Sequence, residues 1–141
     1  MLISYSTKEL DLLARLMRAE ALSDGNLAML MVGNVTVNRV LASCDLFKGK
    51  RSLTKIITMP SGGFVGYNSK LFQSSSTTKE KNLAKRCLRG EYYFPATHAL
   101  WFYAPGKNSS CKSKWFNKEL TGRYKSHCFY QPDPNECPEI R

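Results

Sequence analysis

The segment 27–41 restricts the fold of this chain more than any other part of its sequence, because it is apolar on nearly every side of a helix. Its apolar residues are Leu27, Met29, Leu30, Met31, Val32, Val35, Val37 and Val40. Such a helix is typical of the centre of a domain, where other elements cover it. Gly33 would allow a neighbouring element to approach its backbone. Asn34 and Asn38 share one face, so each needs a buried partner or a ligand.

Two more helices are predicted from capping boxes, in which a hydroxyl residue precedes a glutamate at the third helical position. The box Ser6-Thr7-Lys8-Glu9 opens a helix over about 7–22. The box Thr77-Thr78-Lys79-Glu80 opens a helix over about 77–89, which Gly90 ends. The segment between them, 43–76, is expected to be rich in loops and contains the aromatic residues Phe64 and Phe72.

The pattern after Pro95 favours strands at 99–103 and 124–130. A long loop that carries Trp115-Phe116 joins them, so we expect the two strands to pair as a small antiparallel sheet. The fold class is therefore α+β and mostly helical. The length of 141 residues fits one domain, and no internal boundary divides the range 1–141.

The formal net charge of +10 favours a polyanionic partner, such as nucleic acid, acidic lipid or a cell-wall polymer. Charge alone does not choose among them. The basic residues are scattered rather than interleaved with aromatic residues along one face, which argues against nucleic acid. No apolar stretch is long enough to span a membrane, and the segment 1–9 lacks the pattern of a secretory signal.

The five cysteines form no C-x-x-C pair, which argues against a zinc ribbon. The count is odd, so at least one thiol stays free or pairs between chains. Cys87 falls within a helical pattern and is expected to be buried. Cys111, Cys128 and Cys137 cluster near the C-terminus and could form one disulfide, whose pairing the sequence leaves open.

Glu20 is the carboxylate that best fits a catalytic role. It lies at the end of the first predicted helix, within about 40° of Leu13 and Leu16 on the apolar face. Burial there raises the pKa of a carboxyl group and keeps it protonated, as a general acid requires. The competing interpretation is a structural ion pair with Arg18, or with a downstream arginine, at the helix end.

The other carboxylates offer weaker candidates. Glu9 and Glu80 are explained by capping, and Asp24 lies in the turn after the first helix. Asp45 and Glu91 are in or beside loops, with nothing in the pattern to aim them at Glu20. Motifs of serine hydrolases, nucleotide-binding loops and zinc proteases are absent, and we predict no metal site and no cofactor required for chemistry.

Aromatic side chains are candidates for stacking on sugar rings, although core packing explains many of them. Trp115 and Tyr130, in or beside loops, are the better ligand candidates, with Phe64 and Phe72 in the middle segment. On the last strand, His127 and Phe129 should face one way and Cys128 and Tyr130 the other. We expect His127, Phe129 and Tyr130 to line the cleft, with His127 orienting the substrate, unless it is a core histidine that binds a backbone carbonyl.

Several short motifs, in their order and spacing, resemble the SleB/CwlJ family of cell-wall hydrolases, and its CwlJ branch in particular. They cover nearly the whole chain: Leu12-Leu13-Ala14-Arg15-Leu16-Met17-Arg18-Ala19-Glu20-Ala21, Val32-Gly33-Asn34-Val35, Asn38-Arg39-Val40, Trp115-Phe116-Asn117, and the run from Gly122 to Pro132. The catalytic glutamate of that family falls on Glu20. The resemblance implies a lysozyme-like fold related to lytic transglycosylases, without a separate wall-binding module.

The resemblance also implies a substrate and a place of action. The substrate would be spore cortex peptidoglycan, degraded during germination. The protein would lie in the spore coat and cortex region, assembled there without a signal peptide, with a spore-coat protein as a possible partner and calcium dipicolinate as a possible trigger.

A single glutamate suits a lytic transglycosylase, since other glycosidases use two carboxyl groups. In this mechanism Asn34 or Asn38 could hold the N-acetyl group of the substrate. The alternatives are a hydrolytic muramidase or glucosaminidase of the same fold, and a non-catalytic spore-coat protein that kept the fold.

Overall fold

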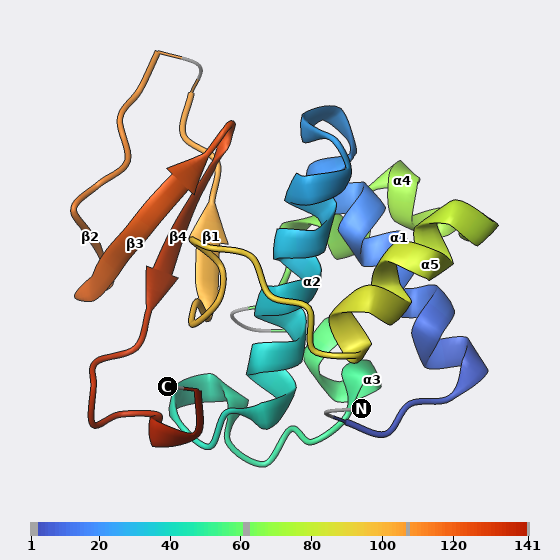
Figure 1. The fold of residues 1–141 in the computed structure, drawn as a ribbon, viewed down its shortest axis with the longest axis horizontal. Helices are drawn as coiled ribbons and strands as arrows, with labels where there is room; N and C mark the ends of the chain where they lie inside the picture. Colours follow the sequence, from blue (N-terminus) through green and yellow to red (C-terminus); the bar gives the residue numbers. More distant parts are fainter. Residues whose placement is uncertain (1–2, 61–62, 107, 141) are drawn as a thin grey trace.

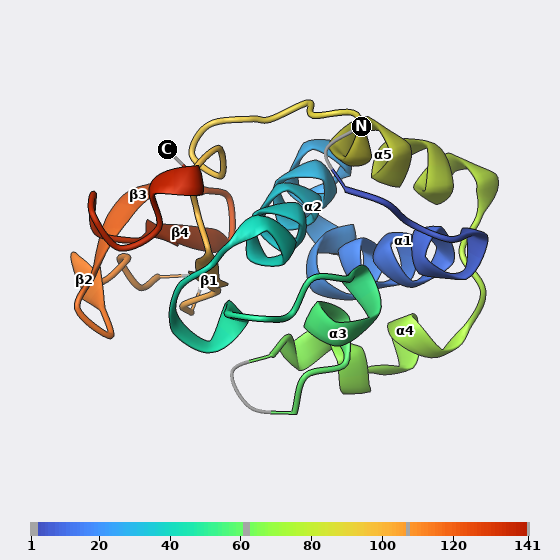
Figure 2. The ribbon, with the colours of Figure 1, turned by 90° about the horizontal axis from the view of Figure 1, so that it is seen from below.

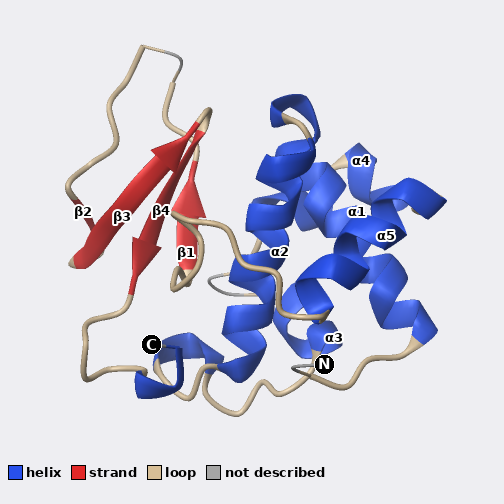
Figure 3. Cartoon of the chain, in the orientation of Figure 1, coloured by secondary structure: helices blue, strands red, loops and turns tan. Residues whose placement is uncertain are grey.

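The computed structural model describes residues 3–60, 63–106 and 108–140, and Met1, Leu2 and Arg141 of the expected domain lie outside this range. Helices occupy one side of the molecule and an antiparallel sheet the other (Figures 1 and 3). The helices are α1 (Thr7–Ala21), α2 (Asn26–Leu41), α3 (Leu53–Ile57), α4 (Lys70–Gln73) and α5 (Thr78–Leu88), with short 3-10 helices η1 (Leu22–Asp24), η2 (Asp45–Phe47), η3 (Val65–Asn68) and η4 (Pro138–Ile140). The strands are β1 (Trp101–Tyr103), β2 (Lys114–Trp115), β3 (Lys118–Tyr124) and β4 (His127–Gln131). The predicted α+β class is confirmed.

Helix α2 lies in the centre, between the sheet and helices α1 and α5 (Figure 2). Every residue from Ala28 to Val40 is buried, as its apolar sequence predicts. Gly33 lies directly against Cys87 of α5, and the Sδ of Met17 would be 3.1 Å from a Cβ added there. The absence of a side chain at Gly33 is thus what lets α5 pack against α2.

Both predicted capping boxes are present, so α1 and α5 begin where their local sequence directs. The Ser6 hydroxyl accepts the N–H of Glu9, whose carboxylate accepts the N–H of Ser6. Thr77 and Glu80 repeat this arrangement at α5. The two helices end within a residue or two of the predicted positions.

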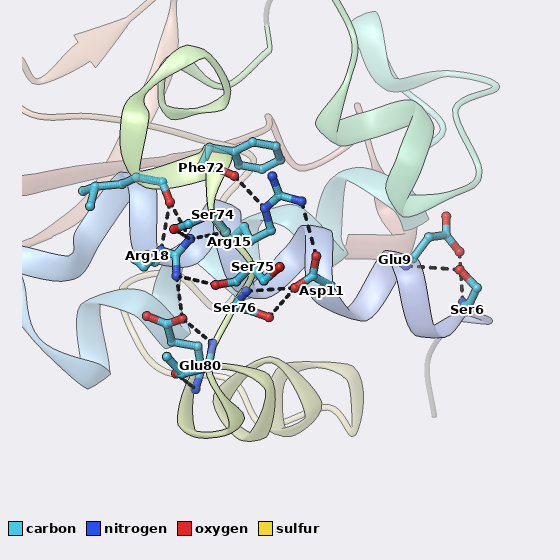
Figure 4. A network of polar contacts seen from close by, with 12 residues as sticks. Ser6, Glu9, Asp11, Arg15, Arg18, Phe72, Ser74, Ser75, Ser76 and Glu80 are labelled. Atoms are coloured by element: carbon cyan, nitrogen blue, oxygen red, sulfur yellow. Dashed lines mark hydrogen bonds and ion pairs between the residues drawn. The ribbon is translucent and has the colours of Figure 1, made fainter.

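Arg18 fastens α4 and the segment that follows it to α1 (Figure 4). Its guanidinium donates to the backbone carbonyls of Leu71, Ser74 and Ser75 at 2.5–3.2 Å and pairs with Glu80 at 3.0 Å. The suggested ion pair between Arg18 and Glu20 is therefore wrong, because Arg18 is committed to the opposite side of the helix. The loop-rich segment 43–76 contains the short elements η2, α3, η3 and α4.

The sheet has the order β1-β4-β3-β2, with every neighbouring pair antiparallel. The predicted pairing of the strands near 99–103 and 124–130 is confirmed, since Trp101 pairs with Tyr130 and Tyr103 with Cys128. The long loop predicted between them is only partly a loop. Its second half forms the hairpin β2–β3, whose first strand has two residues and is too short to leave a periodic pattern.

Two disulfides join distant parts of the chain, where one was expected. Cys111 binds Cys128, and Cys44 binds Cys137 across a separation of 93 residues. Cys87 is free and buried, as predicted. No helix in the described part of the chain is long and apolar enough to cross a bilayer.

Candidate active site

A cavity of about 860 Å³ lies where the helices meet the sheet. Its walls come from the end of α1, the C-terminal half of α2, the start of η2, the segment 63–65, strand β1 and the β2–β3 hairpin. Most of its lining side chains are apolar or aromatic, and its acidic and basic residues are Glu20, Arg39, Asp45, Lys118 and His127. This mixture of a broad apolar surface and a few polar groups is typical of a ligand site.

Glu20 is half-buried in the wall of this cavity, in the last turn of α1. Its Oε2 accepts the backbone N–H of Gly66 at 2.7 Å, while Oε1 has no partner among the described residues. Burial raises the pKa of Glu20, and the Gly66 N–H and the charges of His127 and Arg39 act in the opposite direction. The carboxyl group is thus set up to carry a proton on Oε1 and give it to a ligand.

Position 66 requires a glycine because a side chain there would clash with Glu20, and not because its backbone has an unusual φ angle. A Cβ at this position would lie 2.9 Å from both Cδ and Oε2 of Glu20. Only a glycine therefore brings its N–H to the carboxylate without displacing it. Sequence reasoning missed this residue, because no local pattern connects positions that are 46 residues apart.

His127 connects β4 to the end of α1. Its Nδ1 lies 3.1 Å from Oδ2 of Asp24, and its Nε2 lies 3.1 Å from the backbone carbonyl oxygen of Glu20. Both partners are acceptors, so both bonds form only when the imidazole carries a proton on each nitrogen. The predicted orientation of His127 towards the cavity and the competing bond to a backbone carbonyl are both present. Sequence reasoning did not foresee that the carbonyl belongs to Glu20.

Asp24 completes this connection, although it does not line the cavity. Its carboxylate is buried and accepts the N–H and the hydroxyl of Ser126 at 3.1 and 3.0 Å. Burial alone would raise the pKa of Asp24, but the hydrogen bonds from Ser126 and His127 outweigh burial and lower it. Asp24 is therefore an ionised counter-charge that holds His127, and through it the end of α1.

Arg39 places a positive charge in the cavity wall close to Glu20. Its Nε donates to the carbonyl of Leu100 at 2.7 Å, and its guanidinium lies over the rings of Phe64 and Phe47 at 4.2 and 4.8 Å. Burial lowers the pKa of Arg39 to about 9, although Glu20 raises it, so the group remains charged at neutral pH. Its charge favours the carboxylate form of Glu20 that exists after proton transfer.

Asp45 is the second carboxylate in the cavity lining. It begins η2 with a positive φ of 56°, and its Oδ1 accepts the N–H of Leu46 at 2.8 Å. Glu91, the other candidate, does not line the cavity and is paired with Arg86 at 2.9 Å.

The predicted ligand-binding aromatics fall into two groups. Phe64 and Trp115 line the cavity. Phe72, Phe129 and Tyr130 do not, because each is buried against other side chains. The ring of Phe72 packs on Tyr67, and the ring of Phe129, which projects from β4, packs against Phe102. Tyr130 lies on the other face of the strand and donates to the carbonyl of Lys112 at 2.7 Å. The expectation that Phe129 and Tyr130 line the cleft is therefore corrected for this cavity.

Asn34 and Asn38 serve the core and do not reach the cavity lining. Asn34 donates to the carbonyl of Glu91 at 2.7 Å and accepts the N–H of Tyr93 at 3.0 Å. Asn38 donates to the carbonyls of Thr97 and Ala99. Both amides hold the segment 91–99 against α2, so neither is placed to bind the N-acetyl group of a substrate.

No group of three or more His, Cys, Asp or Glu side chains in the described ranges is placed to hold a metal ion.

The comparisons with known proteins agree on one family. A family model described as cell wall hydrolase matches residues 23–130. The chain is 43% identical to cell wall hydrolase CwlJ of Oceanobacillus iheyensis over 138 residues, covering 98% of this chain and 96% of that protein. It is 38% identical to CwlJ of Bacillus subtilis over the same length, with 98% and 95% covered.

Solved structures with a similar fold come from the SleB proteins. The catalytic domain of Bacillus cereus SleB superimposes with a TM-score of 0.71 at 17% identity, covering 93% of this chain and 97% of that one. The catalytic domain of the Bacillus anthracis protein, described as a germination-specific lytic transglycosylase, gives 0.70 at 19% identity, with 91% and 98% covered. These identities are low enough that the likeness concerns the fold.

Proposed function

The chain belongs to the cell wall hydrolase family and is an enzyme of peptidoglycan, and from this premise we propose that it cleaves the glycan strands of spore cortex peptidoglycan during germination, with Glu20 as general acid. One observation carries the proposal: Glu20 lines the cavity with its pKa raised by burial, one oxygen held by Gly66 and the other without a partner among the residues that the structure describes. A glycosidic oxygen needs such a proton donor as its bond to the sugar breaks.

In the proposed reaction Glu20 first gives its proton to the bridging oxygen, and the bond from that oxygen to the sugar carbon breaks. The N-acetyl group of the same sugar stabilises the cationic carbon. The carboxylate left on Glu20 is stabilised by the Gly66 N–H and by the charges of Arg39 and His127. It then takes the proton of that sugar's 6-hydroxyl, whose oxygen closes a 1,6-anhydro ring, and Glu20 is protonated again.

Lytic transglycosylation is favoured because one carboxyl group performs both proton transfers in it. The description of the Bacillus anthracis SleB domain as a lytic transglycosylase is consistent with this choice. Hydrolysis is the alternative, and Asp45 is the observation that favours it, because it is a second carboxylate in the same cavity. In a hydrolase Asp45 would orient or activate the attacking water.

Two variants and labelled water test the proposal. We expect Glu20→Gln to lower the release of muropeptides from purified cortex by a factor of about 100 to 10,000 while circular dichroism stays unchanged. Mass spectrometry should find anhydro-muramic ends without oxygen from labelled water, and Asp45→Asn should remain active. Labelled reducing ends together with an inactive Asp45→Asn would establish hydrolysis.

A non-catalytic coat protein would release no muropeptides, even as the wild type.

We also propose that the protein acts in the spore coat and cortex region, with a coat protein as a possible partner, and that calcium dipicolinate triggers it. Adding calcium dipicolinate to the purified protein with cortex as substrate tests the trigger, and an unchanged rate would contradict it.

A further inference from the structure

The turn of the β2–β3 hairpin has an unfavourable residue in it. Trp115 pairs with Lys118, so the turn consists of Phe116 and Asn117, which have φ values of 50° and 64°. Two-residue hairpin turns with positive φ at both positions favour Asn, Asp and Gly. A bulky aromatic residue in this conformation is uncommon and costs stability. Asn117 fits the turn, whereas Phe116 does not.

The side chain of Phe116 gains little from the fold in return. It is 79% exposed, although it is large and apolar. The ring contact that it makes is with Trp115, with centroids 5.0 Å apart and planes tilted by 45°. The backbone conformation of Phe116 costs stability, and its exposed ring gains almost no burial on folding to offset that cost, which indicates a role outside folding.

Phe116 lines the cavity, and the aromatic residues next to it are held in place by contacts with one another. Trp115 contacts the rings of Tyr103 and Tyr130 at 5.0 and 5.6 Å, and the hydroxyl of Tyr130 is bonded to Lys112. Tyr103, Trp115 and Phe116, which we call the aromatic rim, all belong to the cavity lining on its sheet side. The rim runs without a gap from the sheet to the exposed tip of the hairpin.

We propose that Phe116 is a stacking residue that binds the apolar C–H face of a sugar ring in the glycan strand. The inference rests on the proposed function, because it takes the same glycan strand as the ligand of the cavity. Glu20 enters the cavity from α1 and Phe116 from the hairpin, so a strand that touches both spans from the helical side to the sheet. Phe116 therefore selects for longer strands and takes no part in the proton transfers.

The test measures binding in the Glu20→Gln background, where cleavage does not interfere. The probes are short and long glycan strands prepared from cortex with the stem peptides removed. Phe116→Asn removes the ring and suits the turn, so we expect long strands to bind about three- to tenfold more weakly. The melting temperature of this variant should stay equal or rise, because Asn adopts positive φ more readily. Phe116→Tyr keeps the ring and should bind as the parent does.

Phe94 provides the matched control. It is 77% exposed but does not line the cavity, so Phe94→Asn should leave binding unchanged. Equal affinity of the parent and Phe116→Asn for long strands would overturn the inference. If Phe116→Asn does not fold, Phe116→Leu is compared with Phe116→Tyr, and equal binding by both contradicts stacking.

The failure of this inference is distinguishable from the failure of the proposed function. With Glu20 intact, a wild type that releases no muropeptides refutes the proposed function. A wild type that cleaves, with a Phe116→Asn variant that cleaves long strands at the same rate and apparent affinity, refutes only the role of Phe116.

Discussion

Substituting Gly66 by alanine tests whether the catalytic assignment depends on the contact between the segment 64–68 and Glu20. The added Cβ would lie 2.9 Å from Cδ and Oε2 of Glu20, while ordinary contacts begin at 3.4 Å. The groups must therefore separate by about 0.5 Å, the difference between these distances. The hydrogen bond from the Gly66 N–H, now 2.7 Å, lengthens or is lost.

The magnitude follows from the loss of that bond and from misplacement of the acid. A hydrogen bond to a charged group contributes about 1.5–3 kcal/mol, and a displacement of about 1 Å can lower a rate about 100-fold. We expect kcat of Gly66→Ala to fall about ten- to 100-fold. The Gly66 N–H lowers the pKa of Glu20, so its loss raises that pKa further. Glu20 then stays protonated up to a higher pH, so the alkaline limb of the kcat–pH profile should shift to higher pH.

The assay is muropeptide release from purified cortex as a function of pH, together with thermal unfolding. Gly106→Ala is the control, since Gly106 is exposed and the nearest heavy atom to an added Cβ is Ser109 Oγ at 3.4 Å. Wild-type kcat in a folded Gly66→Ala variant would refute the reasoning. So would a loss of activity with no movement of the alkaline limb.

Three further predictions concern the acid, its support and the disulfides. Burial raises the pKa of Glu20, so the protonated form of Glu20, and with it the rate, is lost as pH rises through that pKa. The charge that then forms on the buried carboxyl group lowers the stability of the wild type. Glu20→Gln should therefore melt no lower than the wild type at neutral pH, and a lower melting temperature would contradict this. Asp24→Asn should lower kcat about tenfold with KM nearly unchanged, because His127 loses its counter-charge and holds the backbone carbonyl of Glu20 less firmly, so that the carboxyl group is misplaced. A change in KM alone would argue against a positioning role. Cys44→Ser and Cys137→Ser should each lower the free energy of unfolding by about 2–5 kcal/mol in urea titrations, and a wild type whose midpoint is insensitive to reductant would disprove that disulfide.

Structure that depends on interactions local in the sequence could be predicted for this chain, whereas its long-range contacts could not. The capping boxes at Ser6 and Thr77 predict the starts of α1 and α5, because a cap involves only residues three apart. The apolar sequence of α2 predicts its central place, since periodicity and composition are properties of one segment. The same reasoning places Glu20 on the inner face of α1.

The partners of these residues were decided by the tertiary structure. Asn34 and Asn38 were correctly expected to need buried partners, but the choice between a ligand and the backbone of 91–99 depends on where that segment lies. Phe129 and Tyr130 were placed on opposite sides of β4 by alternation, yet alternation cannot tell which side other side chains cover.

What the sequence by itself determined is therefore the long helices, the pairing of the strands β1 and β4, the place of Glu20 on the inner face of α1, and the family. These depend on interactions within a segment or on motifs in order. What only the tertiary structure decided is how Glu20 is held. The bond from Gly66 to Glu20 spans 46 residues, and the pair of Asp24 with His127 spans 103. Such contacts form only when the chain has folded, because no local energy term couples residues that far apart along it.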